Sequence, residues 1–197
     1  AQENLAKSDP GKDLRSQIMA RVIKREVPLL VTAEAAQDIM TAIRIAKEFN
    51  IRIVLDGASD AHLLLNEIKA SGFPVIAHAP MARPGGERAN LSLETASKLR
   101  ATGIPFAMQS GYEGYVPKTR IILFEAAMSA ANGLGPSNAL SAITIDAARI
   151  LGIDARVGSI AVGKDADIAM YDGDPFEWTT HCTGTIINGQ VVSEVVR

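Results

Sequence analysis

The stretch VPLLVTAEAAQDIMTAIRIAKEFNIRIVLDG (27–57) shows the pattern from which we predict the fold of this chain. It begins and ends with short runs that are apolar on consecutive positions, VPLLVTA (27–33) and IRIVLDG (51–57), and the segment between them has apolar residues at helical spacing. Consecutive apolar positions, rather than alternating ones, are typical of strands that are buried on both faces of a parallel sheet. The stretch therefore predicts a strand, a covering helix and a second strand.

The same unit recurs further along the chain. FPVIAHA (73–79) and IPFAMQS (104–110) are similar apolar runs, and the four runs start about 22 to 31 residues apart, which is the spacing of repeated strand-plus-helix units. Four such units make half of an eight-unit barrel, and a whole barrel takes roughly 250 residues. The sequence therefore predicts an α/β fold that is one half of a (β/α)8 TIM barrel.

From Gly158 onward the pattern changes to that of short antiparallel strands. GSIAVGKDADIAMYDG (158–173) predicts two strands joined by a tight turn, and TGTIINGQVVSE (183–194) predicts a hairpin with Asn188-Gly189 at its tip. Two hairpins alone are marginally stable in water, so we expect them to belong to a small β-sandwich whose other strands lie elsewhere. We expect the half barrel to span 1–152 and this sandwich part 153–197.

The composition indicates which kinds of partner this protein has and bears on its location in the cell. The 20 Lys and Arg residues nearly balance the 22 Asp and Glu residues, so we expect no nucleic-acid partner and no membrane partner. Cys182 is the single cysteine, which excludes an intrachain disulfide. No apolar stretch approaches the ~20 residues of a membrane span. The start of the chain carries no signal peptide, but a leader would lie upstream of a chain that begins within a fold, so a cytoplasmic and an exported location both stay open.

The candidate catalytic residues lie where predicted strands end, because parallel sheets bind ligands at the carboxyl ends of their strands. Glu34 and Asp56 suit a carboxylate pair for general acid–base chemistry, and His78 is the histidine at a strand end. The structural alternatives are a helix N-terminal charge for Glu34 and a strand-end hydrogen-bond acceptor for Asp56. We expect His62 and His181 to be surface or packing residues.

The candidate substrate-binding residues surround these positions. They are Thr32, Gln109, Ser110 and Tyr112 at or after strand ends, and Arg83 and Arg88 in the loop PMARPGGERAN (80–90). An arginine in such a loop can hold a carboxylate through two hydrogen bonds, and the alternative is a solvated loop without a ligand. HxH, HExxH and CxxC motifs do not occur in the sequence, so we assign no metal ligands.

The segment ALSAITIDAARILGIDARVGSIAVGKDADIAMYDGDPF (139–176) resembles the ending of metal-dependent amidohydrolases, including imidazolonepropionase-like and prolidase-like members. Its most specific part is GSIAVGKDADIAMYDGDP (158–175), and a weaker likeness extends upstream to about residue 13. The resemblance implies a (β/α)8 barrel with a composite β-sandwich. It also implies that the four predicted strands are barrel strands five to eight, the C-terminal half of such a protein.

The resemblance further implies a zinc centre that is completed in this half by a His on strand five, a His on strand six and an Asp on strand eight. The corresponding positions hold Thr32, Gly57 and either Ser110 or Gly111, so the usual ligands are replaced and the metal site is degenerate. Whether a cofactor is bound therefore stays open.

Two functions follow from the resemblance together with these replacements. The first is a hydrolase of C–N bonds (amide, cyclic amide or peptide) in a small molecule, working without the usual metal set. The second is a degenerate amidohydrolase-like protein that binds a small molecule or serves as a partner subunit, or a fragment that is inactive alone. Because a half barrel has two open sheet edges, we expect its own N-terminal half or a second copy as a partner.

Overall fold

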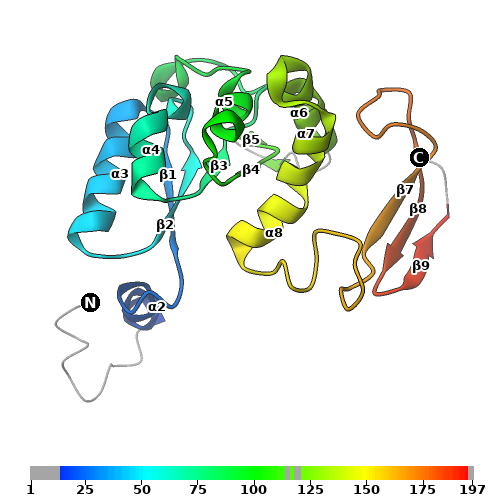
Figure 1. Ribbon diagram of the computed structural model, residues 1–197, viewed down its shortest axis with the longest axis horizontal. Helices are drawn as coiled ribbons and strands as arrows, with labels where there is room; N and C mark the ends of the chain where they lie inside the picture. The colour runs from blue at the N-terminus through cyan, green and yellow to red at the C-terminus, as the bar shows by residue number, and fades with distance from the viewer. Residues whose placement is uncertain (1–13, 114–115, 118–120, 195–197) are drawn as a thin grey trace.

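A four-stranded parallel sheet is the centre of the computed structural model, which describes residues 14–113, 116–117 and 121–194 (Figure 1). The strands are β1 (Leu29–Ala33), β2 (Ile53–Gly57), β3 (Val75–Ala77) and β4 (Phe106–Met108), and they follow one another in this order across the sheet. Every pairing within the sheet is parallel. The predicted parallel sheet of repeated strand–helix units is confirmed.

Helices and turns connect the strands of this sheet and continue beyond it. They are α2 (Leu14–Ile23) before β1; α3 (Ala36–Glu48) after it; η1 (Ala61–Leu63) and α4 (Leu65–Ser71) after β2; and η2 (Gly86–Arg88) and α5 (Thr95–Thr102) after β3. After β4 come the short strands β5 (Tyr112–Glu113) and β6 (Val116–Pro117), then α6 (Ile122–Ser129), η4 (Ala130–Leu134), α7 (Pro136–Ile143) and α8 (Ile145–Leu151). Helix α3 buries Ile39, Ala42, Ile43 and Ala46, the face that its sequence spacing predicts.

The two faces of the parallel sheet have different environments. Leu55, Val75 and Phe106 are paired in register across β2, β3 and β4 and belong to the core beneath the helices. Because side chains alternate along a strand, Leu30 and its register neighbour Val54 lie on the opposite face, and Leu30 is 57% exposed. We call this second face, with Ile76 and Ala107 on β3 and β4, the open face. It is exposed at Leu30 on β1, whereas Val54 and Ala107 are buried.

The open face and the sheet edges lead to a prediction about assembly. Strands β1 and β4 are the outer strands of the sheet, and an unpaired buried backbone group costs about 1–3 kcal/mol against a typical domain stability of ~5–15 kcal/mol. We therefore expect this chain to be found with a partner, either a complementary half barrel or a second copy. Light scattering checks this, and a monodisperse 20.9 kDa species that unfolds cooperatively would contradict it.

A pair of variants distinguishes association through the open face from other contacts. Leu30→Lys is expected to weaken association because it places a charge on the open face. Leu63→Lys is the matched control, because Leu63 lies on η1 and is 56% exposed, close to the 57% of Leu30. Equal effects of the two variants would show that association does not use the open face.

The C-terminal segment forms a separate three-stranded antiparallel sheet of β7 (Ile168–Tyr171), β8 (Cys182–Ile187) and β9 (Gln190–Ser193). The predicted hairpin is confirmed: Asn188 and Gly189, with φ of 50° and 76°, have the two positive φ angles that a type I′ turn requires. The division at residue 152 stays a prediction.

The expected strand near the start of the 158–173 segment was wrong. In the described part of the chain the first strand of this segment begins at Ile168, and Ile160 and Val162 are exposed. The backbone turns instead, with Lys164 N donating to Ala161 O at 3.2 Å. The Lys164 ammonium also bonds back to Ser159 Oγ at 2.7 Å, which stabilises a loop rather than an extended strand.

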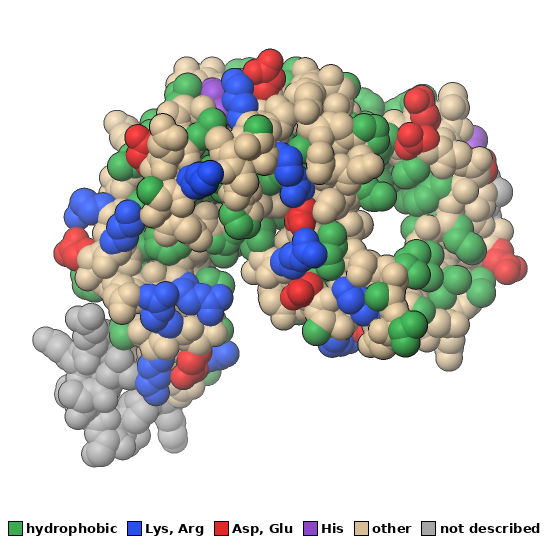
Figure 2. Space-filling model, viewed as in Figure 1, with side chains coloured by type: hydrophobic (Ala, Val, Ile, Leu, Met, Phe, Trp, Pro, Cys, Tyr) green, Lys and Arg blue, Asp and Glu red, His purple; other side chains and the backbone are tan. Residues whose placement is uncertain are grey.

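An apolar groove of about 700 Å³ lies between helices α7 and α8 and the segment that leads into β7. Leu140, Ile143 and Leu151 line it from the helices, and Val157 and Ile168 line it from the other side. In the space-filling view a hollow separates the helices from the C-terminal sheet in this region (Figure 2).

Among the described helices, none has the length and apolar character needed to cross a membrane.

Candidate functional site

Three of the predicted residues lie together at the carboxyl ends of β1, β2 and β4. They are Thr32, Asp56 and Gln109, and the Asp56 carboxylate contacts the other two. The Thr32 hydroxyl donates to Asp56 Oδ2 at 2.9 Å, and the Gln109 amide Nε2 donates to Asp56 Oδ1 at 3.0 Å. Thr32 and Asp56 are register partners, so both side chains lie on the open face. Because both oxygens of Asp56 are engaged, this carboxylate is oriented by its neighbours on two other strand ends.

Glu34 follows β1, and its carboxylate lies directly over Gly57. A Cβ atom at position 57 would stand 2.7 Å from Glu34 Cδ and Oε1 and 2.8 Å from Oε2, so the absence of a side chain there makes room for the carboxylate. Glu34 Oε2 accepts hydrogen bonds from the Ser59 hydroxyl at 2.6 Å and from the Ser59 backbone N–H at 3.2 Å. Within the described residues, no hydrogen bond to the other oxygen, Oε1, is found.

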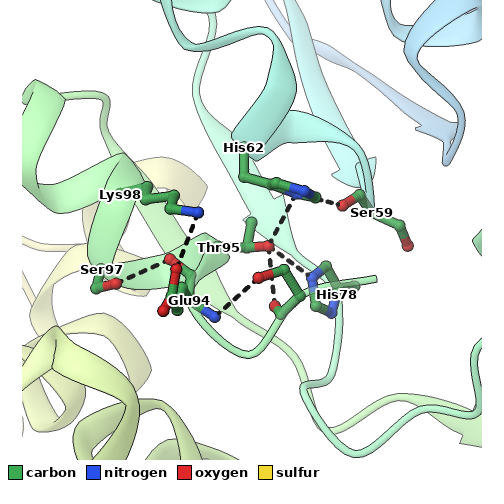
Figure 3. Close-up of polar contacts among 8 residues, drawn as sticks. Ser59, His62, His78, Glu94, Thr95, Ser97 and Lys98 are labelled. Carbon is green, nitrogen blue, oxygen red and sulfur yellow. Dashed lines mark hydrogen bonds and ion pairs between the residues drawn. The ribbon is translucent and has the colours of Figure 1, made fainter. Parts of the chain in front are cut away.

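His78 at the end of β3 is 4% exposed, and both of its ring nitrogens have partners inside the protein (Figure 3). Nδ1 lies 3.2 Å from Ala79 O, and Nε2 lies 3.1 Å from the Thr95 hydroxyl. Burial lowers the pKa of His78 below its ordinary value and outweighs the Glu34 charge, which raises it. Because a carbonyl oxygen only accepts, the Nδ1 that faces Ala79 O carries a proton. The Thr95 hydroxyl beside Nε2 donates to Ser92 O at 3.0 Å.

The lowered pKa of His78 predicts a loss of stability in mild acid. The unfolded chain takes up a proton at a pH near 6.5, whereas the folded chain does so only at lower pH, so acid favours unfolding across that interval. We expect the free energy of unfolding in urea to fall from pH 7.5 to pH 5.5, and to fall less in His78→Gln. An unchanged slope in His78→Gln would contradict the assignment.

Among the side chains that the structure describes, those of Ser110, Arg83 and Arg88 do not take part in the hydrogen bonds of this site. Ser110 is half-buried just beyond β4, and Arg83 and Arg88 are exposed on the loop after β3. Tyr112 begins β5, and its side chain lies outside the described part of the structure. The loop that carries the arginines is attached through Asn90, whose Nδ2 lies 3.4 Å from Asp60 Oδ2.

Several residues of the site were missed by the sequence analysis. Ser59 holds the Glu34 carboxylate, and His62 Nδ1 lies 3.1 Å from Ser59 O and 3.4 Å from Thr95 Oγ1 (Figure 3). Glu125 on α6 is 1% exposed and accepts from Met81 N at 2.9 Å, which fixes the start of the loop after β3. The available signal was the small-residue turn GASD (57–60) at a predicted strand end.

The residues of this half do not fit the zinc centre that the sequence resemblance implies. Thr32 donates to Asp56, and the space above Gly57 is filled by the Glu34 carboxylate rather than by an imidazole. Throughout the described ranges, no three His, Cys, Asp or Glu side chains are grouped so that they could hold a metal ion.

Residues 16–193 match the sequence pattern of the Amidohydrolase family, and this chain belongs to that family. It is 42% identical over 66 residues to an imidazolonepropionase of Shewanella frigidimarina, an alignment that covers 30% of this chain and 16% of that protein. It is 36% identical over 75 residues to an imidazolonepropionase of Shewanella sp. strain MR-4, covering 38% and 18%.

Solved structures agree with the fold over nearly the whole chain. An amidohydrolase from Thermotoga maritima superposes with a TM-score of 0.89 and 28% identity, over 98% of this chain and 51% of that one. A prolidase complexed with N-methylphosphonate-L-proline superposes with a TM-score of 0.61 and 19% identity, over 93% and 50%. The chain thus spans about half the length of these two proteins, and the predicted half barrel is confirmed.

Proposed function

We propose that this protein hydrolyses a C–N bond of a small molecule at the carboxyl ends of its parallel strands, with Glu34 as the general base. The observation that carries the proposal is the state of the Glu34 carboxylate: Ser59 holds Oε2 with two hydrogen bonds, while Oε1 has no partner within the described residues. A carboxylate with one oxygen fixed and the other available is suited to take a proton from water.

Glu34 Oε1 takes a proton from a water molecule, the water oxygen forms a bond to the carbonyl carbon, and the C–N bond breaks as the proton is delivered to the leaving nitrogen. Asp56 is not the base in this scheme, since Thr32 and Gln109 already donate to both of its oxygens. The Thr32 and Gln109 side chains would instead contact the substrate beside Asp56.

The substrate class rests on the named relatives. Two of them are imidazolonepropionases, which supports a cyclic amide as the first class to test. The prolidase-like neighbours share the fold at low identity, so Xaa-Pro dipeptides form a second test class. Arg83 and Arg88 are exposed on the loop after β3, and we propose that they bind a carboxylate of the substrate.

A second candidate function is binding without turnover, as a ligand-binding or partner subunit. The fully engaged Asp56 and the buried His78 favour it, because neither offers a free acid or base to a substrate. In both functions we propose that a complementary half barrel or a second copy covers the open face.

The test is a hydrolysis assay of the natural gene product against cyclic amides and Xaa-Pro dipeptides, with calorimetry of the same compounds in parallel. Turnover is expected for at least one compound. Saturable binding without turnover would overturn hydrolysis in favour of the binding function. Neither binding nor turnover of any compound would overturn both.

A further inference from the structure

We infer that Ser59 is a positioning residue for Glu34, and that the turn 57–60 after β2 is built to direct the Glu34 carboxylate. This inference rests on the proposed function, because it assigns a role to Ser59 in the reaction of Glu34. It concerns a residue that the sequence analysis did not select, and Ser59 is fully buried.

The turn holds Glu34 through both its side chain and its backbone. Ser59 donates its hydroxyl and its backbone N–H to Glu34 Oε2, and Asp60 N donates to Glu34 O at 3.0 Å. Asp60 Oδ2 also accepts from Ala36 N at 2.9 Å, at the first residue of α3. Ser59 therefore holds the Glu34 side chain, and Asp60 holds the backbone at Glu34 and at Ala36.

The backbone of the turn adopts a conformation that its sequence disfavours. Ala58 is completely buried and has φ of +50°, although a residue with a Cβ atom rarely enters the left-handed region. Its N–H donates to Ala33 O at 3.0 Å, which ties the turn to the end of β1. Strained residues of this kind occur where the surrounding structure requires one geometry, and here that geometry directs the Ser59 N–H toward Glu34.

On the side away from Glu34, a chain of polar contacts holds Ser59 (Figure 3). His62 Nδ1 lies 3.1 Å from Ser59 O, and the Thr95 hydroxyl on α5 lies between His62 and the buried His78. The chain therefore runs from Glu34 through Ser59, His62 and Thr95 to β3. Ser59 is the link in this chain that contacts Glu34, so the position of the carboxylate depends on it.

The test measures kcat and KM of the natural gene product for Ser59→Ala, for Glu34→Gln and for the double variant. Ser59→Ala is expected to lower kcat about tenfold, the loss expected for one hydrogen bond to a charged group, with little change in KM. In the Glu34→Gln background the same substitution is expected to have no further effect on kcat, because the two residues act as one unit. Ser71→Ala is the matched control: its hydroxyl donates to Ile68 O at 2.7 Å at the end of α4.

The outcomes separate the inference from the proposed function. If the wild type is active and Glu34→Gln is inactive, but Ser59→Ala keeps the wild-type kcat, then the inference is overturned and the proposed function stands. A tenfold loss that persists in the Glu34→Gln background also overturns it, since Ser59 then acts independently of Glu34. An active Glu34→Gln variant, or an inactive wild type, overturns the proposed function and the inference together. Urea unfolding of each variant identifies any loss of kcat that reflects incomplete folding.

Discussion

Glu34→Gln is expected to lower kcat by about 10³-fold and to leave the fold intact. A positioned general base contributes roughly 10² to 10⁴ in rate, and glutamine has the shape of glutamate without the capacity to take a proton at neutral pH. The amide oxygen of glutamine can still accept from the Ser59 hydroxyl, so the packing over Gly57 is retained. Steady-state kinetics with a substrate identified in the hydrolysis assay, together with urea unfolding, measures both quantities.

Glu48→Gln is the matched control for this prediction. Glu48 is an exposed glutamate at the end of α3 whose carboxylate pairs with Arg44 at 3.1 Å, far along the helix from the strand ends. Exposed pairs of this kind contribute about 0–1 kcal/mol, so neither kcat nor stability is expected to change noticeably. Equal activities of the Glu34→Gln and Glu48→Gln variants would exclude Glu34 as the base.

Gly57→Ala is expected to displace the Glu34 carboxylate and to reduce kcat by about 10²-fold. The new Cβ atom would stand 2.7 Å from Glu34 Cδ, so the carboxylate has to move, and a displacement of about 1 Å can cost two orders of magnitude in rate. The displaced atoms are the end of a flexible side chain, so the sheet does not have to shift. The expected cost in stability is the left-handed backbone at φ +78°, about 1–2 kcal/mol.

Gly72→Ala separates the backbone cost from the collision. Gly72 ends α4 with φ of +71°, close to that of Gly57, and a Cβ atom there meets nothing within 4 Å. The two variants are expected to lose similar stability in urea unfolding, while only Gly57→Ala loses activity. A Gly57→Ala protein with normal kcat would show that the close approach of Glu34 to position 57 is not needed for the reaction.

Much of the fold could be predicted from the sequence because its apolar runs have one physical explanation. Strands of parallel sheets are rich in consecutive apolar residues, and 53–55 and 106–108 lie inside runs of this kind. The loop at 158–164 was mistaken for a strand because Ile160 and Val162 alternate as in a strand. In the structure Lys164 N donates to Ala161 O and the Lys164 ammonium donates to Ser159 Oγ, and periodicity does not reveal these contacts.

The candidate site was predicted only in part, because the apolar runs locate the strand ends but not the contacts made by the turns that follow them. Strand ends could be located, and this placed Thr32, Asp56 and Gln109 on one edge, where they are in contact. The contact between Glu34 and Ser59 depends on positive φ angles at two consecutive residues, Gly57 and Ala58. A positive φ angle is not expected at an alanine, so the sequence did not predict this turn. The pairing of His62 with Thr95 joins residues of two different units, and the spacing within one unit does not show it.

The polar chain from Glu34 to His78 has a consequence for the order of folding. Its members come from the ends of β1, β2 and β3 and from the first residue of α5, so the arrangement exists only after three successive strand–helix units have docked. A folding intermediate that lacks α5 would have a sheet but not the Thr95 hydroxyl that links His62 to His78. A molecule that binds the organised carboxylate would therefore stabilise the docked state of all three units at once. The free energy of this stabilisation would grow with the logarithm of the concentration of that molecule.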